Sequence, residues 1–195
     1  MTQQADTRTF QVQGLEVRDE GGPVIQGLAV PYGTWTDLGP FRERIAPGAF
    51  TGYLESGADV VYNYGHERNQ ILGRRSSGTL SVHDDAEGVH VRLELPDTTL
   101  GRDLAVMVSR GDITGHSIEF TTEADEWRTA DGRDERTVLR GGLPGVALVG
   151  QPAYSSTTAA LRSREAWQKA EADRVVMGLD AARLAKARTI VRGLR

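Results

Sequence analysis

Apolar and polar residues alternate along much of residues 10–160, a pattern that is typical of strands with one buried face. It is clearest in Thr79–His83 and Val89–Leu95, which flank a turn at Asp84–Gly88 and predict a hairpin. Further strands are predicted at residues 10–17, 24–32, 59–64, 72–75, 113–122, 137–139 and 146–149. The first two of these are joined by a Gly-Gly-Pro turn and also favour a hairpin.

Three segments favour helices. Residues 46–54 open with Ala-Pro-Gly and predict a short helix. Thr98–Arg110 has apolar residues mostly at helical spacing, a threonine at its start that can cap it, and Gly111 after its end. Arg164–Leu194 is rich in Ala, Arg, Leu and Glu, and its apolar positions approximate one stripe. This last segment predicts a long helix that packs on the body of the protein or on a partner.

Together these elements predict a β-rich α+β fold in three parts. Residues 1–9 are expected to be a disordered lead, residues 10–160 the folded domain, and residues 161–195 a helical C-terminal tail. A chain of 195 residues fits one domain with a short appendage. A core of that size buries roughly 70% of the surface that the unfolded chain exposes, so it needs neither disulfides nor a structural metal.

Composition narrows the possible functions. The chain has no cysteine, which excludes disulfides, zinc–thiolate sites and cysteine nucleophiles. Its formal net charge of -4 argues against sequence-independent binding of nucleic acid, which needs clustered cations. No apolar stretch is long enough to span a membrane, and residues 1–8 lack the apolar core of a signal peptide.

His66 is the histidine whose position most favours a functional role. It follows Gly65 at the end of the strand predicted at 59–64, where the chain enters an open loop. Loops held by a rigid scaffold often carry catalytic residues. His83 and His90 lie within the predicted hairpin, where a structural or surface role is expected. A metal hydrolase built on these three histidines is the alternative, although they show none of the usual ligand spacings.

Ser117 is the candidate nucleophile. In a strand, Ser117 and Glu119 share one face, whereas Ile118 and Phe120 share the other and are expected to face the core. A serine hydroxyl becomes a usable nucleophile only when a base removes its proton. His66 is the best available base, and the pairing of the two side chains is a hypothesis.

Six short motifs stand in a particular order between residues 24 and 160. They are Gly27–Tyr32, Phe41–Phe50, Tyr64–Glu67, Ile71–Arg74, Gly115–Phe120 and Leu143–Tyr154. In this order they resemble the prohead (procapsid maturation) serine proteases of Hong Kong 97-type tailed phages, which are distantly similar to the herpesvirus assemblins. Gly115–Phe120 resembles the G-x-S-x-x-F motif of the family's nucleophile, and Tyr64–Glu67 matches the position of its catalytic histidine.

The resemblance implies a serine endopeptidase with Ser117 as nucleophile and His66 as its base. The implied fold is an assemblin-like, closed or nearly closed β-barrel with surrounding helices and the helical tail. By analogy with assemblins, backbone N–H groups of Ala153 or Tyr154 would stabilise the oxyanion, since Pro152 has no N–H. The resemblance implies no cofactor and no metal.

The implied place of action is the assembling procapsid in the host cytoplasm. There the enzyme would cleave the scaffolding part of the major capsid protein, or a separate scaffold, and finally itself. The implied partners are therefore the major capsid protein and its scaffolding segment, with self-association as a further possibility. Neither nucleic acid nor a membrane is an expected partner.

The chain departs from the family pattern at the third catalytic position. Many members carry a Glu on the closing strand, and assemblins a His, whereas this chain has Gly145 there. We expect Glu119 to orient His66 instead, because it shares the face of Ser117. A Ser–His dyad with a solvated Glu119 is the alternative, and Glu67 is a poorer third candidate because it adjoins His66 in sequence.

A second class of function stays open. The chain could be a non-catalytic capsid-assembly or scaffold protein that retains the protease fold, with its Ala/Arg/Glu-rich tail used for coiled association. Cleavage of a capsid precursor would distinguish the two functions. A metal hydrolase, in contrast, predicts sensitivity to chelators.

Overall fold

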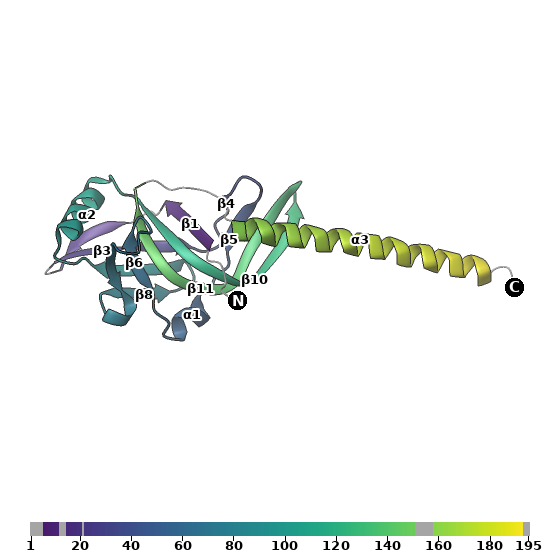
Figure 1. Ribbon diagram of the computed structural model, residues 1–195, viewed down its shortest axis with the longest axis horizontal. Coiled ribbons are helices and arrows are strands. Elements are labelled where there is room, and N and C mark those ends of the chain that lie inside the picture. The colour runs from purple at the N-terminus through teal and green to yellow at the C-terminus, as the bar shows by residue number, and fades with distance from the viewer. Residues whose placement is uncertain (1–5, 12–14, 21, 151–157, 193–195) are drawn as a thin grey trace. The chain divides into compact units, whose positions relative to one another are not determined.

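The computed structural model describes residues 6–11, 15–20, 22–150 and 158–192. The chain divides into two compact units, Met1–Thr157 and Thr158–Arg195 (Figure 1). The first unit holds the strands and two of the α-helices, and the second holds the long helix α3, Thr158–Arg192. None of the helices in the described ranges is long and apolar enough to cross a membrane.

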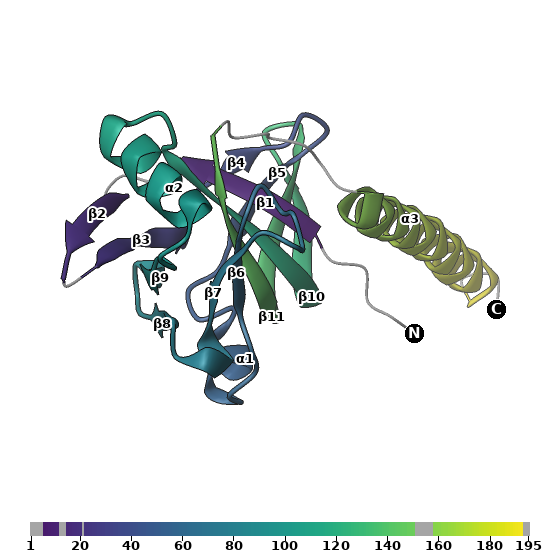
Figure 2. The ribbon, with the colours of Figure 1, turned by 60° about the vertical axis from the view of Figure 1, so that its left-hand side comes forward.

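Within the described residues, seven strands form the larger sheet. Its centre is the hairpin of β10 (Gly115–Ala130) and β11 (Arg133–Val149), which turns at Asp131 and Gly132. The edge of β10 that faces away from β11 pairs with β1 (Asp6–Gln11), and Figure 2 shows β1 lying along it. The other edge of β11 pairs in parallel with two short strands, β5 and β6. Two further short strands complete the sheet, since β4 pairs with β5 and β7 pairs with β6. These four short strands span Thr36–Asp37 (β4), Arg42–Ile45 (β5), Val61–Tyr64 (β6) and Ile71–Arg74 (β7).

The smaller sheet has four strands in the part of the chain that the structure describes, in the order β2-β3-β9-β8. The predicted hairpin of residues 79–95 is confirmed as β8 (Leu80–Asp84) and β9 (Gly88–Glu94). The other hairpin joins β2 (Glu16–Asp19) to β3 (Pro23–Pro31). All of these pairings are antiparallel. Because successive side chains of a strand point to opposite faces of the sheet, alternate side chains face the core.

The short helices follow their sequence signals. α2 (Thr99–Arg110) begins after Thr98, whose hydroxyl accepts a hydrogen bond from the N–H of Gly101, and ends at Gly111 with φ of 77°. Both caps match the prediction, because threonine satisfies a free helical N–H and glycine adopts the left-handed conformation without strain. α1 is limited to Thr51–Glu55, and the short 3-10 helix η1 spans Arg75–Ser77.

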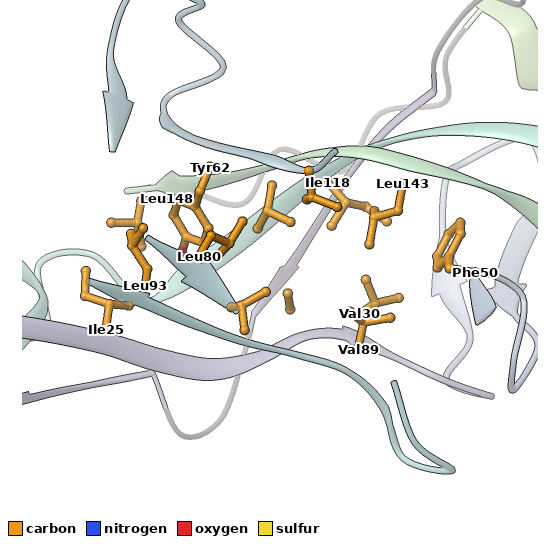
Figure 3. Packing of buried hydrophobic residues seen from close by; sticks show 14 of the residues in the cluster. Ile25, Val30, Phe50, Tyr62, Leu80, Val89, Leu93, Ile118, Leu143 and Leu148 are labelled. Carbon is orange, nitrogen blue, oxygen red and sulfur yellow. The ribbon is translucent and has the colours of Figure 1, made fainter. Parts of the chain in front are cut away.

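The core lies between the two sheets. Figure 3 shows Ile25, Val30, Val89 and Leu93 of the smaller sheet facing side chains of the larger one. Those facing side chains are Tyr62, Ile118, Leu143 and Leu148, each fully buried. Burial of one such side chain stabilises the fold by about 1.5–3 kcal/mol. This layer therefore fixes the positions of β6 and β10, which contribute Tyr62 and Ile118 to it.

Four expectations need correction. Residues 6–9 belong to β1 and are not a disordered lead, because β10 offers them a free strand edge. The strand expected at 10–17 is divided between β1 and β2, which lie in different sheets. The β-rich α+β class is confirmed, but among the described strands no pairing joins the two sheets, so neither closes into the expected barrel. The tail helix starts at Thr158, three residues before the expected boundary of 161.

Candidate active site

Ser117 and Glu119 lie on β10 with their side chains on the same face, as the two-residue period of a strand requires. Between and beyond them, Ile118 and Phe120 are fully buried in the core. The opposite face of β10 therefore carries a hydroxyl and a carboxylate one residue apart. The predicted division of this strand into a core face and a polar face is correct.

His66 reaches this face from the end of β6. The parallel pairing of β6 with β11 places Tyr64 beside Leu148, and the N–H of Gly65 donates to the carbonyl of Leu148. Gly65 and His66 then both take φ of 64°. A positive φ is uncommon for a residue with a side chain and occurs often at functional sites. This turn ends the strand abruptly and directs the imidazole toward β10.

The three side chains form a continuous chain of hydrogen bonds. Nε2 of His66 lies 2.6 Å from Oγ of Ser117, and its Nδ1 lies 3.1 Å from Oε1 of Glu119. Their exposure differs, since Ser117 is fully buried, whereas 24% of the His66 side chain and 37% of the Glu119 side chain are exposed. The arrangement has the order acid, imidazole, hydroxyl that activates a serine.

The hydroxyl hydrogen of Ser117 has two acceptors within reach. Oγ lies 2.6 Å from Nε2 of His66 and 3.0 Å from the carbonyl oxygen of Arg8 on β1. With the imidazole proton on Nδ1, held by Glu119, Nε2 is free to accept that hydrogen. The Glu119 carboxylate thus favours the tautomer of His66 in which the serine can be deprotonated.

Glu119 occupies the space beside Gly145, its direct partner on β11. A Cβ at residue 145 would lie 3.5 Å from Oε2 of Glu119. The carboxylate therefore stands next to the position where the family pattern led us to expect a Glu. This geometry accounts for the absence of an acidic side chain on β11, because β10 supplies a carboxylate at the same place.

β1 covers Ser117. Thr9 is the register partner of Ser117, and Arg8 is that of Ile118. The Arg8 side chain enters the protein, where both of its Nε and Nη2 atoms bind the Glu43 carboxylate at 2.6 and 3.0 Å. Sequence reasoning missed this strand, because residues 6–9 carry no apolar alternation that distinguishes them from a lead segment.

A cluster of buried charges surrounds this contact. It comprises Asp6, Arg8, Glu43, Arg136 and Asp125, of which the first four are 2% exposed. Burial alone would lower the pKa of Arg136, but the carboxylates of Glu43 and Asp125 raise it above its ordinary value. Each of the three carboxylates and two guanidinium groups lies within 4 Å of at least one group of opposite charge, which offsets part of the cost of burying them.

His116, next to Ser117, points to the core side of β10 and is fully buried against the Tyr62 ring. Desolvation lowers its pKa to about 4, so it is neutral at physiological pH. His116 is therefore a core residue, and His66, which contacts Ser117 on the other face of β10, is the candidate base. In the sequence His116 directly precedes the candidate nucleophile, and no role was predicted for it.

The remaining candidates are not brought to this site. His83 and His90 face each other across the β8–β9 hairpin with ring centroids 6.5 Å apart, separate from His66. No group of three or more residues able to hold a metal occurs in the described part of the chain. Ala153 and Tyr154, expected near the oxyanion, lie outside the described residues.

Comparisons with known proteins identify the family and a similar fold. Residues 9–171 match the family described as caudovirus prohead serine protease. The capsid assembly protease gp21 of bacteriophage T4 has a similar structure, with a TM-score of 0.54 and 14% sequence identity. The similarity covers 78% of this chain and all of that one, and at this identity it concerns the fold. No curated protein matches the sequence significantly. Because the family match spans most of the sequence, the chain belongs to the caudovirus prohead serine proteases.

Proposed function

We propose that this protein is a serine endopeptidase that cleaves the scaffolding part of the major capsid protein, or a separate scaffold, and itself. It would act in the host cytoplasm inside the assembling procapsid. The observation that carries the proposal is the hydrogen-bonded series Ser117–His66–Glu119, formed between strand β10 and the turn that follows β6. Membership of the prohead protease family and the similarity to the T4 enzyme support the same conclusion.

In this proposal Ser117 attacks the scissile carbonyl while Nε2 of His66 takes its proton. The resulting imidazolium is stabilised by Glu119, and it then protonates the leaving amine. Water hydrolyses the acyl-enzyme with His66 acting again as base. The N–H groups of Ala153 or Tyr154 remain the proposed oxyanion donors, because a tetrahedral intermediate needs prearranged donors.

Glu119 is proposed as the orienting residue in preference to the dyad alternative. Oε1 of Glu119 lies at hydrogen-bond distance from Nδ1 of His66. The Glu119 side chain keeps this contact although it is partly exposed to solvent. Glu67 adjoins His66 and makes no hydrogen bond to it among those found in the described residues, whereas Glu119 does. A carboxylate in this place holds both the tautomer and the ring orientation.

The partners follow from the reaction. The substrate would be the major capsid protein with its scaffolding segment, and cleavage of the chain itself would involve a second copy or its own ends. α3 would join the enzyme to the scaffold or be trimmed, which the exposed apolar side chains Val175, Val176 and Met177 support. A closed, assemblin-like barrel would require a strand contact beyond those of the described residues.

Co-expression with a scaffold-bearing capsid protein tests the function. We expect the wild-type chain to shorten the capsid protein, and Ser117→Ala to leave it at full length while the variant still folds. Ser81→Ala is the matched control, since Ser81 is exposed on β8, in the other sheet. Full-length capsid protein with the wild-type chain would instead support a non-catalytic assembly role, and processing by Ser117→Ala would reject the nucleophile.

A further inference from the structure

Ser117 is closed to solvent, although the two residues that would activate it are not. Its side chain is fully buried, whereas 24% of the His66 side chain and 37% of the Glu119 side chain are exposed. A nucleophile attacks only when the carbonyl carbon can come within about 3–3.5 Å of it. The hydroxyl must therefore be uncovered before a peptide bond can reach it.

Strand β1 covers this hydroxyl. It pairs antiparallel with β10 over Gly115–Phe120, so it extends past Ser117 in both directions. Oγ of Ser117 donates a hydrogen bond of 3.0 Å to the carbonyl oxygen of Arg8. A serine hydroxyl has one hydrogen, and while the Arg8 carbonyl accepts it, Nε2 of His66 cannot. β1 therefore shields the nucleophile and also competes with its base for the same proton.

Charged groups and backbone pairing hold β1 in place. Nε and Nη2 of Arg8 bind the two oxygens of Glu43 at 2.6 and 3.0 Å, and Asp6 lies 3.5 Å from Arg136. Among the described strands β1 pairs only with β10, so its departure breaks a single ladder. The side chains of residues 6–8 are all polar and add no apolar burial to the core. Segments with few buried apolar contacts open most readily in a folded protein.

The cluster of buried charges keeps its net charge when β1 leaves. β1 contributes one acid, Asp6, and one base, Arg8, which depart together. Arg136 still pairs with Glu43 at 2.8 Å and with Asp125 at 2.7 Å. Each charge that stays behind thus keeps a direct partner, and it is an unpaired buried charge that makes the loss of an ion pair costly. Release of β1 is therefore compatible with an intact fold.

We propose that β1 is an autoinhibitory strand, and that the enzyme alternates between the closed form of this structure and an open form in which β1 has left β10. The proposal rests on the proposed function and adds the regulation of its site. Ser117 reacts only in the open form, so its observed reactivity is the intrinsic reactivity multiplied by the open fraction. The contact between Arg8 and Glu43 lowers that fraction, because it exists in the closed form alone.

The rate at which a fluorophosphonate labels Ser117 in the full chain reports the open fraction. We expect slow labelling of the wild type. Arg8→Met should speed the labelling by roughly 10- to 100-fold, because loss of hydrogen bonds to a charged group weakens the closed form by about that factor. Unfolding cannot imitate this result, since labelling needs the folded contact between His66 and Ser117.

Arg128→Met is the matched control for loss of an arginine. Arg128 lies on the same strand as Ser117, and its Nε binds Glu135 at 2.6 Å. Neither residue of this pair contacts β1 in any hydrogen bond or ion pair of the described residues. The control should therefore be labelled at the wild-type rate. Acceleration as large as that of Arg8→Met would overturn the proposal, because any lost arginine would then loosen the site.

A cut between β1 and β2 in the folded protein gives a second measurement. The recognition sequence of a cysteine protease, inserted between Gln11 and Glu16, allows the cut to be made after folding by an enzyme without a nucleophilic serine. A linked strand has an effective concentration in the millimolar range, and a cut one does not, so at micromolar protein the labelling should accelerate by at least about tenfold. A synthetic peptide of residues 6–11 should restore the slow rate. The same peptide with Arg8→Met should need a concentration roughly 10- to 100-fold higher.

The outcomes separate autoinhibition from the proposed function. Labelling of Ser117 that depends on His66, but is no faster after the cut, would overturn the autoinhibitory strand and leave the protease assignment intact. This comparison holds even if Arg8→Met fails to fold, because the cut chain folds beforehand. Absence of Ser117 labelling in the wild type, in Arg8→Met and in the cut chain would reject the protease and its inhibition together.

Discussion

Glu119 lies directly opposite Gly145, with Oε2 3.5 Å from the position of a Cβ at residue 145. Two neighbouring strands can therefore deliver a carboxylate to the same point beside His66. Family members with an acidic residue on the closing strand would approach that point from β11, whereas this chain approaches it from β10. We therefore propose that Glu119 supplies from β10 the carboxylate that such members would supply from β11.

Removal of this carboxylate should slow the chemical step. We expect Glu119→Gln to lower kcat by roughly 10²- to 10⁴-fold, as loss of an orienting acid does in other serine hydrolases. Glu123→Gln is the control, since Glu123 lies on the same strand but pairs with Arg140 at the surface. An unchanged kcat in peptide-cleavage assays of Glu119→Gln would mean that Ser117 and His66 act as a dyad.

A carboxylate placed on the opposite strand should restore part of the activity. In the Glu119→Ala background, the space left by the side chain can accept one from residue 145, so we expect Gly145→Glu to recover a measurable part of kcat. Gly145→Gln in the same background, which has the shape without the charge, should recover none. Equal rates for these two double variants would contradict the electrostatic role.

The buried His116 should make the fold sensitive to acid. Its pKa of about 4 lies below the ordinary value of about 6.5 because burial disfavours the charged form. Between these values the unfolded chain binds the extra proton, so this contribution is complete above pH 6.5 and is lost as the pH falls toward 4. The loss amounts to about 3 kcal/mol.

Urea unfolding at several pH values measures this effect. His116→Phe should remove the extra slope between pH 6.5 and 4, whereas His83→Gln, at an exposed position, should keep it. If the free energy of unfolding depends on pH in the same way in the wild type and in His116→Phe, then His116 does not contribute to the acid sensitivity of the fold.

Gly141 permits a close approach of β11 to β10. A Cβ there would lie 2.0 Å from the carbonyl oxygen of Thr121, next to the register shifts in β10. Gly141→Ala must therefore separate the strands, and we expect a loss of at least about 1–3 kcal/mol in the free energy of unfolding. Gly52→Ala, in helix α1 with open space around the position, should cost nothing. Equal midpoints in urea would refute this account of the glycine.

Local pattern predicted the parts of this protein that depend on neighbouring residues. Alternation gave the shared face of Ser117 and Glu119, and the caps at Thr98 and Gly111 gave the bounds of α2. The long β10–β11 hairpin was predicted only in three pieces, at residues 113–122, 137–139 and 146–149, because charged residues occupy much of the rest of these strands. The motif order supplied the association of His66 with Ser117, which no local pattern contains.

The parts that were missed depend on pairings distant in sequence. The Ser117–Arg8 contact joins positions 109 residues apart, and the Arg8–Glu43 pair joins positions 35 apart. A polar segment such as residues 6–9 becomes a strand only because β10 has a free edge and Glu43 needs a cation. Which edge stays free is a property of the assembled sheet, so sequence reasoning could not foresee that β1 would cover the nucleophile.

The central claim is that His66 activates Ser117, and covalent labelling tests it most directly. We expect a fluorophosphonate to modify one serine of the full chain, mapped by peptide mass spectrometry to Ser117, and His66→Ala to abolish the labelling while the fold persists. Modification of another serine, or labelling of Ser117 at the same rate without the imidazole, would contradict the account.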